Sequence, residues 1–227
     1  MRVFPTLSDA EHAQVSAAVA AAEAHSAGEI VTIIAERSDG YSDVALAWSA
    51  LVGLLALAAL AIWPDFYLGI YEWISGGWVL HWTPRGLFTL AALVFGIKFG
   101  AVWLLQLWAP LRFALIPPAI KHDRVRARAV GFFKVGAERR THGRTGILIY
   151  LSAREHRAEI VADAAIAGKV PAEVWGEAMA AMLAHLREGR VADGMCAAIE
   201  RVGAVLAEHF PRATDDVNEL PDRLIEV

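Results

Sequence analysis

The chain has 227 residues, 56% hydrophobic and only 20% charged, and its mean hydropathy of +0.42 is unusual for a soluble protein. Part of the chain is therefore expected to lie in lipid. The formal net charge of −4 provides no overall positive field, so nucleic acid is not expected as a partner. The single cysteine excludes an internal disulfide and fits a reducing compartment.

Residues 8–25 are expected to form an amphipathic helix. Ser8 and Glu11 have the spacing of a capping box. Apolar residues then recur on one stripe at Val15, Val19 and Ala22. The following run, Glu29–Ala35, is short, apolar and rich in β-branched residues, which is typical of a buried strand. The start of the chain turns polar before any apolar run, so no signal peptide is expected.

Two long apolar runs come next. Residues 44–64 carry no charge, and residues 87–109 carry only Lys98. Each run has the length of ~20 residues that is needed to cross a hydrocarbon core of ~30 Å. The sequence therefore predicts a transmembrane hairpin. Residues 65–86 between the spans are aromatic but broken by charges and glycines, so they are expected to form an interfacial or shallowly re-entrant loop.

Aromatic and basic residues indicate how this hairpin is oriented. Every tryptophan except Trp175 lies within or between the two runs, and tryptophan prefers the headgroup level of a bilayer. The only arginine or lysine between the spans is Arg85, whereas several basic residues flank the hairpin. The positive-inside rule therefore predicts that both flanks are cytoplasmic.

The flanks are expected to fold together. After the hairpin, residues 119–140 and 171–188 and a stretch beginning at residue 193 have helical patterns, while residues 146–151 and 157–162 are predicted strands joined by a short turn. Neither flank alone has enough elements for a core. We therefore expect residues 1–43 and 112–227, the latter with an acidic tail, to form one domain interrupted by residues 44–111. An even number of crossings is required for both parts to lie on one side.

Three segments carry a resemblance to a known family. They are SDAEHAQVSAAVAAAEAHSAGEIVTII, FFKVGAERRTHGRTGILIYLSAREHRAEIVAD and FPRATDDVNELPDRLIEV. In this order they resemble the TPM domain family, in particular its bacterial membrane branch. The resemblance implies an α/β/α sandwich with a small central sheet, located here at the bacterial cytoplasmic membrane as a multi-pass protein. Family members are linked to photosystem repair, acid phosphatase activity, calcium binding and receptor assembly.

One part of the sequence departs from the family. After the third strand, similar sequences place glycine next to the acidic residue, whereas Asp163 is followed here by two alanines. A close backbone approach to a cation or phosphate at this point is therefore in doubt. Clustered carboxylates are still the preferred ligands of calcium. The candidate calcium ligands are Asp163, Asp215 and Asp216, although an exposed acidic tail produces the same pattern.

The second span contains an ionisable residue between two small ones. Lys98 would be costly at the centre of a bilayer without an acid, water or a route to the interface. Gly96 and Gly100 around it have a small-xxx-small spacing that lets another helix approach, and Ser49 and Gly53 form a similar ridge in the first span. Either the ridges pack the hairpin on itself while Lys98 reaches the interface, or they bind another membrane protein that bears an acid.

The remaining polar clusters favour binding over catalysis. A basic run beside the second span is expected to face anionic lipid headgroups. It consists of Lys121, Arg124, Arg126 and Arg128. His122 beside Asp123 is interpreted as a solvated pair, because no placed nucleophile accompanies it. The leading hypothesis is a non-catalytic scaffold, assembly or accessory factor of a membrane complex, with a membrane protein or a second copy as partner and no cofactor. The alternative is a metal-assisted, calcium-linked phosphatase.

Overall fold

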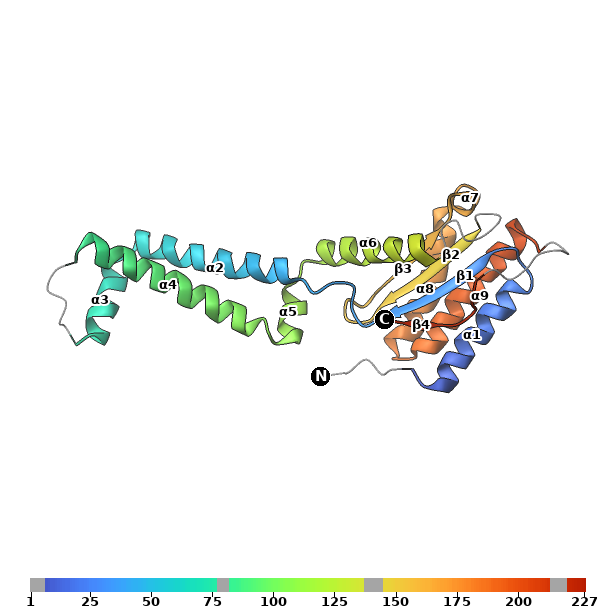
Figure 1. Cartoon of the computed structure of the whole chain (residues 1–227), viewed down its shortest axis with the longest axis horizontal. Coiled ribbons are helices and arrows are strands. Elements are labelled where there is room, and N and C mark those ends of the chain that lie inside the picture. The colour runs from blue at the N-terminus through green and yellow to red at the C-terminus, as the bar shows by residue number, and fades with distance from the viewer. Residues whose placement is uncertain (1–6, 77–81, 137–144, 213–219) are drawn as a thin grey trace. The chain divides into compact units, whose positions relative to one another are not determined.

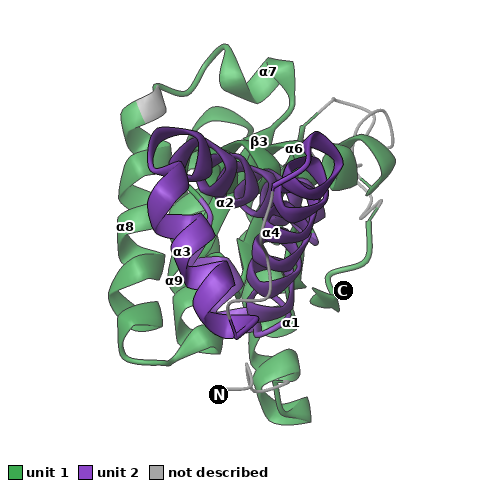
Figure 2. Cartoon of the chain, turned by 90° about the vertical axis from the view of Figure 1, so that its left-hand side faces the viewer, with its two compact units in different colours: residues 1–39, 117–227 green, residues 40–116 purple. Residues whose placement is uncertain are grey.

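The computed structural model describes residues 7–76, 82–136, 145–212 and 220–227, and it divides into two compact units (Figures 1 and 2). The first unit combines residues 1–39 with residues 117–227. The second unit consists of residues 40–116.

The first unit is built around a four-stranded mixed sheet with the order β3-β2-β1-β4. Strand β1 (Glu29–Ala35) runs parallel to β2 (Gly146–Ser152). Strand β2 turns back into β3 (Arg157–Ala162), and the short β4 (Ile225–Glu226) pairs parallel to β1 on its other edge. The three predicted strands are therefore present. Strand β4 was not predicted, because two residues are too few to form an alternating pattern.

Helices cover both faces of this sheet. They are α1 (Asp9–Glu23), α6 (Pro118–Gly136), α7 (Ala164–Ala167), α8 (Ala172–Arg187) and α9 (Val191–His209). One face of the sheet, represented by Ile34 and Ile149, shares a core with α1, α8 and α9. The opposite face, represented by Ile33 and Leu148, packs against α6. Because both faces are covered, the central strands β1 and β2 are buried along their whole length and mostly apolar, as expected for the predicted α/β/α arrangement.

The first helix begins as predicted. The Ser8 hydroxyl accepts a hydrogen bond from the Glu11 amide, and the Glu11 carboxylate accepts one from the Ser8 amide. Both bonds satisfy amides that a helix end leaves unpaired. Val15 and Val19 lie fully buried on the stripe that the sequence indicates.

The second unit is a helical hairpin. Its helices are α2 (Ser42–Ile62), α3 (Pro64–Ile74), α4 (Pro84–Leu105) and α5 (Ala109–Leu115). Helices α2 and α4 pack along each other, and both are long and apolar enough to cross a membrane, with mean hydropathies of 2.3 and 2.0. Of the most apolar stretch, 17% is buried in α2 and none in α4, unlike the core helix of a soluble protein.

Aromatic side chains join the first and last segments of the second unit. The ring of Tyr41 meets Phe113 edge-on at 5.7 Å between centroids. The Trp48 indole donates a hydrogen bond to the Leu115 carbonyl at 3.1 Å. These contacts hold the two ends of the unit together.

Two details of this unit correct the sequence reading. Residues 65–86 were expected to be a loop, but residues 64–74 form the eleven-residue helix α3. Charges and glycine there suggested a broken segment, yet Asp65 lies in the first turn of the helix, where a carboxylate is favourable. The second long helix ends at Leu105 rather than near residue 109, and α5 follows after a bend.

Candidate functional site

The small-residue ridge of α2 faces α4. A Cβ atom placed on Gly53 would lie 2.6 Å from the Phe95 ring, so glycine is needed for the close approach of the two helices. Ser49 is fully buried, and its hydroxyl donates to the Ala45 carbonyl at 2.9 Å. This ridge therefore packs within the hairpin, which was one of the two alternatives that the sequence offered for the ridges.

A glutamine completes the contact between the two helices. The buried Gln106 amide lies 3.0 Å from the Ala45 carbonyl, 3.2 Å from the Ser49 hydroxyl and 3.2 Å from the Val102 carbonyl. Such bonds stabilise helix pairs in an apolar environment. Sequence reasoning missed this residue, although a lone amide at the end of an apolar run was the available signal.

The small-residue ridge of α4 points elsewhere. A Cβ atom on Gly96 or Gly100 would meet nothing within 4 Å, and the Lys98 side chain between them is exposed. The structure thus separates the two ridges that the sequence treats alike. Ser49 and Gly53 are used inside the hairpin. The outer surface of α4, here called the open α4 face, carries Gly96 and Gly100 on one side and Lys98, two residues from each, on the other.

The basic residues of α6 have partners within the first unit. Arg124 pairs with Asp39 at 3.2 Å, and Arg126 with Glu159 at 3.8 Å. The guanidinium of Arg128 stacks over the Phe132 ring at 4.7 Å. These exposed contacts are weak individually. Binding of Arg124, Arg126, Arg128 and Lys121 to lipid headgroups therefore stays a prediction.

The predicted calcium ligands are only partly described. Asp215 and Asp216 lie outside the described residues. Asp163 is buried, and its carboxylate accepts a hydrogen bond from the Gly146 amide at 3.1 Å. This bond ties the end of β3 to the start of β2. Within the described ranges, no three His, Cys, Asp or Glu side chains are grouped to hold a metal ion, so a calcium site derives no support from Asp163.

A polar network occupies the carboxyl end of β1 and β2, where parallel sheets commonly bind ligands. The Ser38 hydroxyl lies 3.0 Å from the Tyr150 hydroxyl and donates to the Ser152 hydroxyl at 2.7 Å. Ser152 donates to Glu155 at 2.6 Å, and Glu155 also accepts the Ser38 amide at 3.0 Å. Burial raises the pKa of Tyr150, which therefore stays a neutral hydroxyl. The network fixes the backbone just before the chain leaves the sheet.

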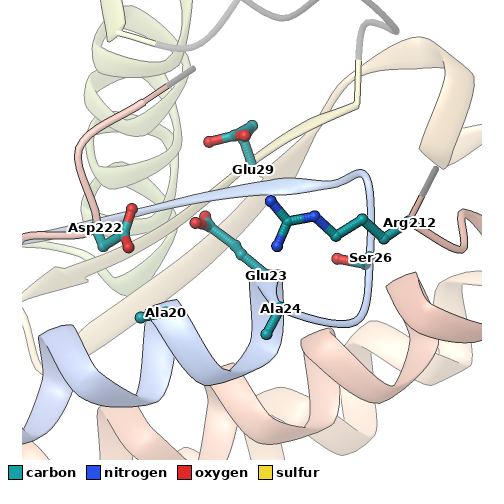
Figure 3. Close-up of a pocket in the computed structure, with 7 residues that line it drawn as sticks. All are labelled: Ala20, Glu23, Ala24, Ser26, Glu29, Arg212 and Asp222. Atoms are coloured by element: carbon teal, nitrogen blue, oxygen red, sulfur yellow. The ribbon is translucent and has the colours of Figure 1, made fainter. Parts of the chain in front are cut away.

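A cavity of about 180 Å³ lies where α1 and the start of β1 meet the segments that follow α9 (Figure 3). Three carboxyl groups line it, from Glu23, Glu29 and Asp222, together with the guanidinium of Arg212. One oxygen of Glu23 accepts the Ile30 amide at 2.6 Å, and one oxygen of Glu29 accepts the Leu220 amide at 3.1 Å. The cavity therefore brings together both parts of the interrupted first unit.

Glu23 is the unusual group in this cavity. It is only 7% exposed, and its second carboxyl oxygen accepts no hydrogen bond within the described part of the chain. Burial raises its pKa from 4.5 to about 8, the Ile30 amide opposes the rise, and the charges of Glu29 and Asp222 add to it. At neutral pH the carboxyl therefore holds a proton, which it can share with Asp222.

Sequence analysis did not single out Glu23, although a signal was present. It lies four residues after Val19, on the stripe that Val15 and Val19 bury. An acidic residue in register with a buried stripe indicates a carboxyl with a shifted pKa.

Residues 113–205 match the family model of the TPM domain. The chain carries a TPM domain. The match begins in α5 and ends in α9, so it includes β2 and β3 but not β1. No curated protein matches the chain.

A solved structure is similar to the chain in fold. It is the NMR structure of the BA42 protein from the psychrophilic bacterium Bizionia argentinensis sp. nov.. The TM-score is 0.58 with 17% sequence identity, and the match covers 100% of this chain and 99% of that chain. At this low sequence identity, the similarity supports only the α/β fold and says nothing about activity. Assignment to a bacterial membrane branch stays a prediction.

The first prediction concerns the packing of the hairpin. Gly53→Leu should destabilise it by about 1–3 kcal/mol, because the new side chain must displace the Phe95 ring. Gly96→Leu is the matched control and should leave the stability unchanged, since open space surrounds that position. Unfolding in detergent micelles, followed by circular dichroism, measures both variants. Equal destabilisation by the two substitutions would contradict the assignment of the ridges.

The second prediction concerns pH. The pKa of Glu23 is higher in the folded state, so the folded protein binds more protons and its free energy of unfolding falls as pH rises from 4.5 through about 8. Glu23→Gln should remove this fall and stabilise the TPM domain by on the order of a few kcal/mol at about pH 9. Thermal unfolding between about pH 5 and pH 9 measures the effect.

A second glutamate provides the control for that measurement. The backbone amide of Ser8 lowers the pKa of Glu11, which therefore titrates below this pH range. Glu11→Gln should leave the pH dependence unchanged. A wild-type slope that survives in Glu23→Gln would show that another group causes it.

Proposed function

We propose that this chain is an integral membrane protein whose hairpin anchors the TPM domain to the bilayer and binds a membrane partner, so that it acts as a non-catalytic scaffold, assembly or accessory factor. The observation that carries this proposal is the apolar outer surface of α2 and α4. Both helices exceed 20 residues, yet little of their surface is buried in the protein. Lipid is the medium in which such a surface is stable.

The proposed membrane topology follows from the order of the strands in the TPM domain. Strand β1 precedes the hairpin, strand β2 follows it, and the two pair in one sheet. Both flanks must therefore lie on one side of the membrane, which two crossings permit. The arginines and lysines of the flanks favour the cytoplasmic side, and we assign the protein to the bacterial inner membrane.

The open α4 face is the surface proposed to bind the partner. Lys98 places an exposed ammonium in the middle of a spanning helix, and on the other side of α4 Gly96 and Gly100 leave room for a second helix. An acidic residue in the partner would neutralise Lys98. A second copy of this chain has no acid at that depth, because Asp43, Asp65 and Glu72 lie at or beyond the helix ends. A different membrane protein is therefore the better fit.

The third prediction tests this partner surface. A photo-activated cross-linker at Ile97, which is exposed beside Lys98, should capture a membrane protein that has a carboxylate in a spanning helix. Lys98→Leu and Gly96→Leu should each reduce capture at least about tenfold, the effect of losing ~1.4 kcal/mol of binding, while Lys98→Arg retains most of it. Quantitative mass spectrometry of cross-linked native membranes measures capture.

Two outcomes would count against the open α4 face. Unchanged capture in Lys98→Leu would mean that the lysine reaches the interface instead of pairing in the membrane. Capture of only the chain itself would replace the partner by a homo-oligomer.

The fourth prediction separates the scaffold from a calcium-linked phosphatase. The Asp163 carboxylate is engaged by the Gly146 amide, so we expect the purified protein to hydrolyse a simple phosphate ester no faster than its Asp163→Asn variant, with or without calcium. Release of nitrophenol from nitrophenyl phosphate measures this. Calcium-dependent turnover in the wild type that Asp163→Asn abolishes would defeat the scaffold proposal.

A further inference from the structure

Helix α3 lies at the end of the hairpin opposite the Tyr41 and Phe113 contact. In Figure 1, α2 and α4 run along the hairpin while α3 runs across its end, and Figure 2 views α2 and α4 nearly end-on with α3 extended in front of them. Its eleven residues cover only about 16 Å, too short to cross a bilayer. It therefore cannot be a third span.

The two sides of α3 differ in chemistry. Phe66, Ile70, Trp73 and Ile74 have the spacing of one helix face, and their exposed fractions are 64%, 40%, 82% and 71%. Asp65 and Glu72 lie on the opposite side, and α3 contains no lysine or arginine. Such a segregated face, rich in aromatic residues, is typical of helices that lie in a membrane interface.

Contacts fix the rotation of α3 about its axis. The Trp82 indole, just before α4, donates to the Glu72 carboxylate at 3.3 Å. The same indole meets the Tyr71 ring edge-on at 5.2 Å. These contacts engage the side of α3 away from Phe66, Ile70 and Trp73. The apolar face is thus left open by the hairpin itself.

We propose that α3 is a membrane-interface helix whose apolar face, made by Phe66, Ile70, Trp73 and Ile74, lies in the headgroup and upper acyl region of the leaflet opposite the TPM domain. This inference rests on the proposed membrane anchoring. Lipid is chosen as the occupant because the face continues the apolar surface of α2, which ends at the adjacent Ile62 and Trp63, both exposed. The carboxylates of Asp65 and Glu72 lie on the other side of α3, and α3 has no basic residue, so binding depends on apolar contact and not on anionic lipid.

The fifth prediction tests this placement with single spin labels in vesicles of phosphatidylcholine. Cys196 is the only native cysteine, so Cys196→Ser provides a background for Ile70→Cys on the apolar face, Asp65→Cys on the polar face and Leu55→Cys in the middle of α2. Accessibility to dissolved oxygen and to a water-soluble nickel chelate reports lipid depth. We expect a higher ratio of oxygen to nickel accessibility at Ile70 than at Asp65, and the highest ratio at Leu55.

Each other outcome has its own meaning. Equal, nickel-accessible signals at Ile70 and Asp65, with Leu55 still in lipid, would overturn the placement of α3 while leaving the anchoring intact. Low accessibility of Ile70 to both reagents would mean that protein, and not lipid, covers the face. Nickel accessibility at Leu55 would instead overturn the proposed membrane anchoring. Adding phosphatidylglycerol should leave the Ile70 ratio unchanged.

Discussion

The parallel pairing of β1 with β2 is the constraint on which the rest of the structure depends. Residues on opposite sides of the hairpin become direct neighbours, with Glu29 opposite Gly146 and Ala35 opposite Ser152. A parallel pair always needs a long crossover, and in this chain the crossover contains the hairpin and α6. The sheet cannot be completed until the second flank returns to the first. Folding of the TPM domain is thus coupled to the hairpin.

Polar groups lie at both ends of the parallel strands and make different contacts at each end. At the carboxyl end, Ser38, Tyr150, Ser152 and Glu155 satisfy one another and hold the backbone before it leaves the sheet. The position that often binds a ligand in α/β proteins therefore stabilises the exit of the chain. At the other end, Glu23 and Glu29 line a cavity. Glu23 accepts a hydrogen bond from an amide of β1, and Glu29 accepts one from an amide of the segment before β4.

Periodicity predicted the elements of the TPM domain well, because long buried strands and amphipathic helices carry regular patterns. The limits of β1 were predicted to the residue, whereas β4 is too short for any pattern and depends on its pairing with Ile33 and Ile34. Helix α3 was missed because Gly69 and the charges suggested a loop. The different directions of the Gly53 and Gly96 ridges depend on the rotation of each helix, which a sequence does not encode locally.

The distribution of satisfied and open groups explains why function is assigned to the hairpin. In the described TPM domain, Asp163 is tied to Gly146, and Arg124 is paired with Asp39. In the hairpin, the polar groups of Gln106 and Ser49 are engaged in the helix contact, whereas Lys98 is an exposed charge in the middle of the apolar helix α4. In the proposed bilayer, an ammonium at this position would be costly unless another molecule or the interface receives it. The same argument that makes Asp163 structural is the reason why the proposed partner is placed at Lys98.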